Sequence, residues 1–152
     1  MSKSQSLALK AATILWIIWG LVHLLAGVSI LSTSTVMGFS MIADAVDTSA
    51  LAAHDYHPAV GGVQDQHAWN LAWFGLATIV GGGFIWRANK TAIWVTAMIG
   101  GLADLGYFIF LDLPGYVLFF PGTVMTLVSG SAILLTGWVY FTHTWTDAPR
   151  TV

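Results

Sequence analysis

Two ionisable side chains lie inside apolar stretches that are long enough to cross a membrane. Asp104 lies in the run 92–111 (AIWVTAMIGGLADLGYFIFL), and His23 lies in the run 11–31 (AATILWIIWGLVHLLAGVSIL). A charged group at that depth is costly unless it faces protein or water and has a partner, so both residues mark a candidate functional site. A carboxylate can hold an imidazole in one tautomer and raise its basicity. The pair therefore predicts proton exchange or ligand orientation, with a structural hydrogen bond between helices as the alternative.

The two residues are predicted to lie at the same depth. His23 stands eight residues before Leu31, and Asp104 stands eight residues before Asp112. At about 1.5 Å per helical residue, both are about 12 Å below the outer end of their helices. We therefore expect His23 and Asp104 to meet if their helices are neighbours.

Other polar and aromatic residues share helix faces with this pair, because positions three and four apart lie on one face. We expect these faces to form an outward-opening cup, with His23 and Asp104 as the catalytic residues. If the protein is an enzyme, His23 is the acid and base, Asp104 orients it, and Asn70 and Tyr107 hydrogen-bond the substrate. The predicted substrate-binding residues are Trp19, His67, Asn70, Trp73, Tyr107 and Thr126.

A metal or haem site is a further hypothesis. His54 and His57 stand three residues apart, and together with His67 they could hold Zn²⁺ or Cu²⁺, although no established ligand spacing is matched. Haem b would need a histidine inside the bundle. His23 and His67 are offset in depth, which disfavours a bis-histidine site and leaves one axial histidine as the haem alternative. The sequence identifies no cofactor.

Composition excludes several classes of protein. The chain has 152 residues, of which 57% are hydrophobic and only 8% charged, so it is not an ordinary soluble domain. Cysteine is absent, which rules out disulfides, thiolate metal sites and cysteine nucleophiles. Five Lys and Arg residues spread along the chain cannot form a phosphate-binding patch, so nucleic acid is not an expected partner. The expected environment is a lipid bilayer.

The predicted fold is all-α, a four-helix transmembrane bundle forming a single membrane domain over residues 1–152. Apolar runs of membrane-spanning length place the helices at about residues 11–31, 68–86, 91–111 and 121–143. Pro121 suits a first helical turn, and the alternative is a longer fourth helix kinked there.

Residues 32–67 are predicted to form a long outer loop that contains a short interfacial helix. Phe39, Ile42 and Val46 recur at helical spacing, as in an amphipathic helix lying along the membrane surface. Asp47 is interpreted as a helix cap. The sequence His57-Pro58, followed by Gly61-Gly62, is interpreted as a stop signal.

Charge predicts the orientation of the chain. In the four-span arrangement, the basic residues all fall on one side of the membrane; they are Lys3, Lys10, Arg87, Lys90 and Arg150. The positive-inside rule then places both termini in the cytoplasm.

This layout resembles the DoxX-like group of small four-helix membrane proteins. The features that carry the resemblance are a glycine-containing first span, a long outer loop, a polar start to the second span at residues 67–75, and a short turn at residues 87–90. The glycines of the first span stand in Trp19-Gly20-Leu21 and Ala26-Gly27. The resemblance implies a cytoplasmic-membrane protein, sometimes an accessory subunit of quinone-linked or redox systems, and it assigns no site residues.

Three functions are consistent with these observations. The first is binding of a small amphiphilic ligand, such as a quinone, an isoprenoid or a lipid-like molecule, with or without acid and base chemistry by His23 and Asp104. The second is a non-catalytic accessory subunit that docks through glycine faces, as a homo-oligomer or in a larger membrane redox complex. The third is a metal- or haem-binding membrane protein. The sequence leaves open whether the protein is an enzyme.

Overall fold

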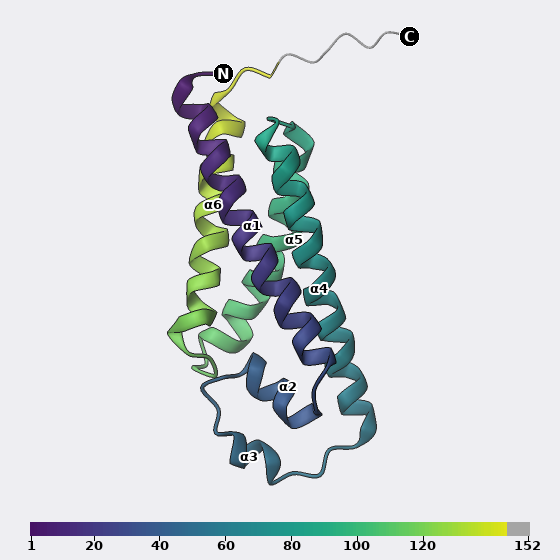
Figure 1. Ribbon diagram of the computed structural model, residues 1–152. Coiled ribbons are helices and arrows are strands. Elements are labelled where there is room, and N and C mark those ends of the chain that lie inside the picture. The colour runs from purple at the N-terminus through teal and green to yellow at the C-terminus, as the bar shows by residue number, and fades with distance from the viewer. Residues whose placement is uncertain (146–152) are drawn as a thin grey trace, which may run out of the picture.

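The computed structural model describes residues 1–145, and these are mostly helical (Figure 1). Four helical segments are long and apolar enough to span a membrane: Lys3–Leu31, Pro58–Trp86, Lys90–Asp112 and Phe119–Thr142. This confirms the all-α, four-helix bundle and a multi-pass membrane protein. The elements in chain order are α1 (Lys3–Leu31), α2 (Thr35–Ile42), α3 (Thr48–Ala52), α4 (Pro58–Trp86), α5 (Lys90–Tyr107), the π-helices η1 (Phe108–Asp112) and η2 (Phe119–Thr123), and α6 (Val124–Thr142).

The long helices form a ring in which α1 and α5 stand diagonally opposite. Helix α1 packs against α4 and α6, and α5 also packs against α4 and α6. The short helices α2 and α3 lie at the end of the bundle away from the N-terminus (Figure 1). A site in the middle of the bundle can therefore receive side chains from all four long helices.

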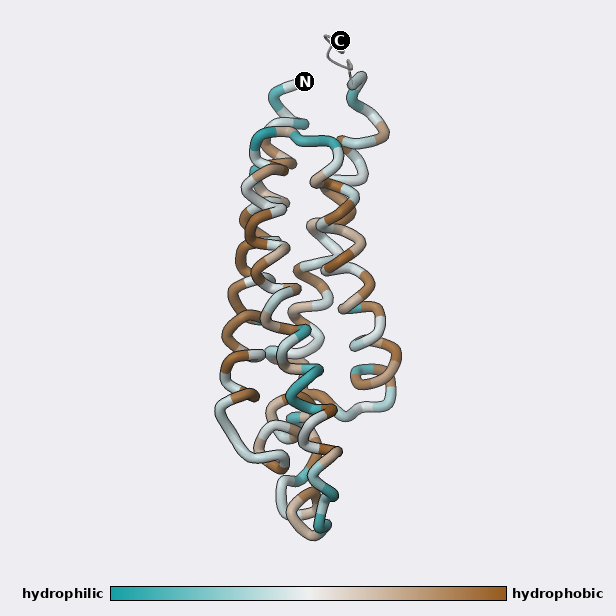
Figure 2. The backbone as a smooth tube through the Cα atoms, turned by 90° about the vertical axis from the view of Figure 1, so that its right-hand side faces the viewer, coloured by the Kyte–Doolittle hydropathy of each residue, from teal (hydrophilic) through white to brown (hydrophobic). Residues whose placement is uncertain are grey.

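Apolar side chains cover the outside of the bundle. Along the long helices, hydrophobic residues dominate, and hydrophilic residues gather toward the two ends (Figure 2). Leu134 and Phe141 on α6 are 75% and 76% exposed. Lipid chains solvate such surfaces, so this pattern belongs to a protein immersed in a bilayer.

The basic residues gather at one end of the bundle. The Lys10 ammonium lies 5.4 Å from the centre of the Trp86 ring, and the Lys90 ammonium lies 5.4 Å from the centre of the Tyr140 ring. These contacts join the start of α1, the turn between α4 and α5, and the end of α6. Arg150, which was assigned to the same side, lies outside the described residues.

Helix α4 begins ten residues earlier than predicted, at Pro58 instead of residue 68. The interpretation of His57-Pro58 as a stop signal is wrong, because these residues begin the helix. His57 Nδ1 accepts a hydrogen bond from the backbone N–H of Ala59 at 3.2 Å, and Pro58 stands where its missing N–H costs nothing. With 29 residues, α4 is about 43 Å long, so its first turns extend beyond a hydrocarbon core of about 30 Å.

Helix α1 also extends beyond its apolar run and begins at Lys3 instead of residue 11. A capping box starts it: Ser2 Oγ accepts from the Gln5 backbone N–H, and Gln5 Oε1 accepts from the Ser2 backbone N–H. Hydropathy located the membrane-crossing part of this helix and missed the polar turns that precede it.

The outer loop contains two short helices instead of one. Helix α2 holds Phe39 and Ile42, whereas Val46 lies beyond its end. The predicted cap at Asp47 is confirmed, since its Oδ1 accepts a hydrogen bond from the Ser49 backbone N–H at 2.9 Å at the start of α3. The Ser49 hydroxyl and backbone N–H hold the pKa of Asp47 below its usual value, because they stabilise the carboxylate.

Contacts at both sides fasten the outer loop to the bundle. The Leu118 backbone N–H donates to Asp44 Oδ1 at 2.6 Å, and the Ala45 backbone N–H donates to the Tyr116 carbonyl at 3.1 Å. On the other side, Gly38 of α2 packs so closely on Gln64 of α4 that a Cβ would clash with its amide. Helix α2 is therefore held across the outer end of the bundle.

The fourth span does not start as one continuous helix. Its first turn is η2, which contains the cis peptide between Phe120 and Pro121, and Phe120 has extended backbone angles. Regular α-helix follows from Val124. The predicted start near Pro121 thus falls inside a short irregular turn.

Glycines let the helices approach closely. A Cβ at Gly20 of α1 would lie 2.6 Å from the Gly75 carbonyl oxygen of α4, and one at Gly27 would clash with the backbone at Ala68. Gly81, Gly82, Gly100 and Gly101 also face neighbouring helices. For Gly83 and Gly137, no other atom of the described chain lies within 4 Å of an added Cβ.

These contacts generate a stability prediction. We expect Gly20→Ala to lower the free energy of unfolding by about 1 to 3 kcal/mol, because its methyl group would push α1 away from the α4 backbone. Unfolding in mixed detergent micelles, followed by circular dichroism, measures the change. Gly83→Ala is the matched control and should be neutral or slightly stabilising, because its methyl group enters open space on a helix. Equal stability of the two variants would contradict the close packing of α1 on α4.

Candidate functional site

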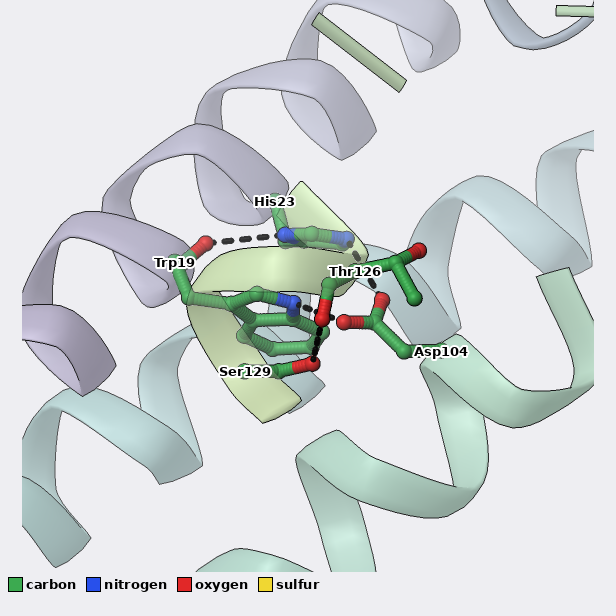
Figure 3. Close-up of polar contacts among 5 residues, drawn as sticks. All are labelled: Trp19, His23, Asp104, Thr126 and Ser129. Carbon is green, nitrogen blue, oxygen red and sulfur yellow. Dashed lines mark hydrogen bonds and ion pairs between the residues drawn. The ribbon is translucent and has the colours of Figure 1, made fainter. Parts of the chain in front are cut away.

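A buried carboxylate lies between α1 and α5. Asp104 is 4% exposed, and its Oδ2 accepts a hydrogen bond from the Trp19 indole N–H at 2.7 Å (Figure 3). Trp19 itself is fully buried. Because α1 and α5 stand diagonally opposite, this bond crosses the centre of the bundle. It supplies the partner that an intramembrane carboxylate requires.

His23 lies against the same tryptophan. Their rings are stacked, with centroids 3.6 Å apart and planes 17° apart. His23 Nδ1 lies 2.8 Å from the Trp19 carbonyl oxygen, one helical turn earlier (Figure 3). A carbonyl oxygen only accepts hydrogen bonds, so the geometry assigns a proton to Nδ1. Nε2 is then the nitrogen that can gain or lose a proton.

The two titratable groups face each other without a direct hydrogen bond. His23 Nε2 lies 3.8 Å from Asp104 Oδ1, which suits an ion pair and exceeds the usual hydrogen-bond distance (Figure 3). The sequence prediction that these residues meet at one depth agrees with this geometry. Their proposed catalytic role is a separate matter and stays a prediction.

His23 and Asp104 both line a cavity of about 370 Å³. This volume falls within the range of small-molecule sites in proteins. Helices α1, α4 and α5 form its wall, together with η1, η2 and the start of α6, and Met41 and Ile42 of α2 border its outer side. Most of the wall is aliphatic or aromatic; the polar or titratable side chains in it are His23, His67, Asp104 and Tyr107.

Three of the predicted substrate-binding residues belong to this centre. His67 and Tyr107 line the cavity, and their role in substrate binding stays a prediction. Trp19 has a different place: it is fully buried behind His23 and holds Asp104, so it supports the site from within the protein. The spacing of Trp19 and His23 indicated a shared face, and the indole hydrogen bond to Asp104 was not foreseen.

Asn70 and Trp73 lie away from the cavity. The Trp73 indole N–H donates to Asn70 Oδ1 at 3.1 Å, and Trp73 faces a shallow groove between α4 and α5. The cavity side of α4 carries His67, Leu71 and Phe74, so Asn70 falls just off that face. A difference of one position rotates a side chain by about 100° around a helix. This rotation explains why Leu71 lines the cavity and Asn70, which was predicted to do so, does not.

Residues of α6 complete the surroundings of Asp104. Figure 3 shows Thr126 and Ser129 beside the carboxylate. Ser129 is 2% exposed, and its hydroxyl donates to the Thr126 carbonyl at 3.1 Å. Thr126 Oγ1 is buried and has no hydrogen-bond partner in the described part of the chain. Thr126 borders the pair but does not line the cavity, where it was predicted.

The predicted metal ligands do not come together. His57 caps α4, His54 packs its ring 6.3 Å from that of Tyr56, and His67 lines the cavity. Within residues 1–145, no three His, Cys, Asp or Glu side chains are grouped to hold an ion. The long α4 separates its cap from His67 by nearly three turns, which the prediction of a loop there overlooked. An axial haem ligand at His23 would require Nε2 to turn from Asp104, so the geometry does not favour haem.

Comparisons with models of protein families, with curated proteins and with solved structures gave no match to this chain. The resemblance to DoxX-like proteins therefore stays a prediction. The properties of the site rest on its geometry alone.

The Trp19 hydrogen bond generates a prediction about Asp104. We expect Asp104→Asn to fold as the unmodified protein does, because the amide oxygen still accepts from the indole. Asp104→Leu is expected to lower the free energy of unfolding by about 1 to 3 kcal/mol, since the buried indole N–H loses its acceptor. Unfolding in mixed micelles compares the two. If the Leu variant were as stable as the Asn variant, the hydrogen bond would not hold the bundle together.

Proposed function

We propose that the protein binds a small amphiphilic molecule of quinone, isoprenoid or lipid-like chemistry in this cavity. The ligand places a polar group between His23 Nε2 and Asp104 Oδ1. The observation that carries the proposal is the 3.8 Å separation of these two atoms, which belong to residues of the cavity wall. One small polar atom can lie within hydrogen-bonding distance of both.

The lining and depth of the cavity support an amphiphile from the bilayer. Apart from four titratable residues, the wall is apolar, so the body of the ligand must be apolar as well. Val22 lines the cavity, is 36% exposed and lies about 13 Å below the outer end of α1. At that depth an exposed side chain faces hydrocarbon. This arrangement favours a ligand that arrives from the membrane.

The pair can also move a proton. Nδ1 is occupied by the Trp19 carbonyl, so Nε2 would take a proton from a bound ligand or return one to it. Asp104 would stabilise the imidazolium that forms. Under this enzymatic version of the proposal, His23 acts as acid and base and Asp104 orients it.

The proposed orientation has both ends of the chain in the cytoplasm and the protein in the inner membrane. The support is the gathering of Lys10 and Lys90 at one end of the bundle, together with the acidic residues of the outer loop at the other. The cavity then lies in the non-cytoplasmic half of the membrane.

A non-catalytic accessory subunit is the second candidate function, and the surface of α6 favours it. Gly130 and Gly137 stand two helical turns apart, and an added Cβ at either would meet no other atom of the described chain within 4 Å. Small residues on a lipid-facing helix allow another helix to approach closely. A homo-oligomer could use this face, and so could a larger redox complex of the kind that the DoxX-like resemblance implies.

Ligand occupancy can be tested directly. Native mass spectrometry of gently extracted protein should show one defined bound amphiphile, and Asp104→Asn should lose most of it while remaining folded. Asp112→Asn is the matched control: this residue does not line the cavity, and an amide retains the acceptor for the Thr123 hydroxyl. An unmodified protein without bound amphiphile, or equal occupancy in all three proteins, would contradict the proposal. An empty cavity together with partner chains in a fixed ratio would favour the accessory-subunit function.

Orientation can be tested because the chain has no cysteine. Single cysteines at exposed positions, Ser4→Cys at the basic end and Ala53→Cys in the outer loop, can be labelled in intact cells with a membrane-impermeant maleimide. We expect labelling at position 53 and none at position 4 until the membrane is permeabilised. The reverse pattern would overturn the proposed orientation.

A further inference from the structure

We propose that the cavity selects ligands by a hydroxyl group, so that its natural ligand is an alcohol or phenol with an apolar body. This inference rests on the proposed function and narrows it. It follows from counting which polar atoms of the centre are already bonded and which remain for a ligand.

Two of the four polar atoms of the pair are occupied by protein. Asp104 Oδ2 holds the Trp19 indole N–H at 2.7 Å, and His23 Nδ1 is bound to the Trp19 carbonyl at 2.8 Å. Asp104 Oδ1 and His23 Nε2 remain, 3.8 Å apart. An atom at about 2.8 Å from each can sit between them, because hydrogen bonds of that length span up to about 5.6 Å.

A hydroxyl group can donate a hydrogen bond to this centre in either protonation state of the imidazole. When Nε2 carries a proton, the hydroxyl oxygen accepts from it and donates to Oδ1. When Nε2 is bare, the hydroxyl donates its proton to one of the two acceptors. An ether or ketone oxygen has no proton to donate, so it leaves Oδ1 of the ionised Asp104 unpaired whether or not Nε2 carries a proton, and buried unpaired acceptors are costly.

Charge argues against anionic head groups. Among the described residues that line the cavity there is no Lys or Arg. Lys10 and Lys90 are at the opposite end of the bundle, beside Trp86 and Tyr140. A phosphate or carboxylate would stand next to Asp104 without a Lys or Arg to neutralise it, and in an apolar cavity that repulsion is weakly screened.

The length of the apolar wall determines how long the tail of a suitable probe should be. Along α1 the wall extends from His23 to Ile30, which is two helical turns or about 10 Å. With its head group at His23, a ten-carbon chain can fill this length. 1-Decanol, decyl methyl ether and decanoate therefore compare three head groups on one tail.

The test is a native mass spectrometry titration of the full chain in lipid nanodiscs with each of the three probes. We expect 1-decanol to bind at least about tenfold more tightly than the methyl ether or decanoate. Equal or tighter binding of the ether or of decanoate would overturn the hydroxyl inference and leave the cavity proposal standing. If no probe binds and the extracted protein is empty, the proposed function fails, and this inference fails with it.

A variant distinguishes recognition by Asp104 from a structural effect. In Asp104→Asn, the amide oxygen keeps the indole hydrogen bond and the amide N–H₂ takes the place of Oδ1, so the centre gains a donor. We expect the preference for alcohol over ether to collapse, with ether binding improved. Asp112→Asn should keep the preference of the unmodified protein. If Asp104→Asn kept the preference for alcohol over ether, Asp104 Oδ1 would not be the atom that recognises the hydroxyl.

Discussion

The hydrogen bond from the Trp19 indole to Asp104 is the interaction on which the rest of the site depends. It joins the two diagonal helices α1 and α5 and gives a carboxylate inside the membrane an internal partner. The same tryptophan stacks on His23 and accepts from its Nδ1 through the backbone carbonyl. One residue therefore positions both titratable groups and determines which of their atoms are left for the cavity.

Packing explains why a cavity forms on one side of this centre and not on the other. Toward the cytoplasmic end proposed here, Trp16 is fully buried and fills the bundle, and Gly100 makes room for its ring. Toward the outer end, the cavity lies between α1, α4 and α5, beside η1, η2 and the start of α6, and α2 borders it. Hydrogen bonds of Asp44 and Ala45 to the segment before η2 keep that cover in place.

Much of this arrangement could be predicted from the sequence, for identifiable reasons. Apolar runs of bilayer length predicted the four spans. The number of residues from His23 and from Asp104 to the outer end of each span is equal, and this predicted that the two residues share a depth. The start of α4 was missed because a proline after a capping histidine serves as a start, whereas His-Pro followed by glycines suggested an end. Asn70 and Trp73 were misplaced because helical spacing gives relative faces and cannot give the absolute rotation of α4. The apolar walls carry no chemical signature, so the cavity itself required the structure.

Solid-state nitrogen NMR of histidine-labelled protein in lipid tests the central claim most directly, with His23 assigned by difference from a His23→Asn sample. The account predicts that His23 carries its proton on Nδ1 when neutral, and that Nε2 alone responds when 1-decanol is added. A neutral ring protonated on Nε2 with a bare Nδ1 would contradict it, because the Trp19 carbonyl could then not be the partner of Nδ1 and the imidazole would not face Asp104 as described.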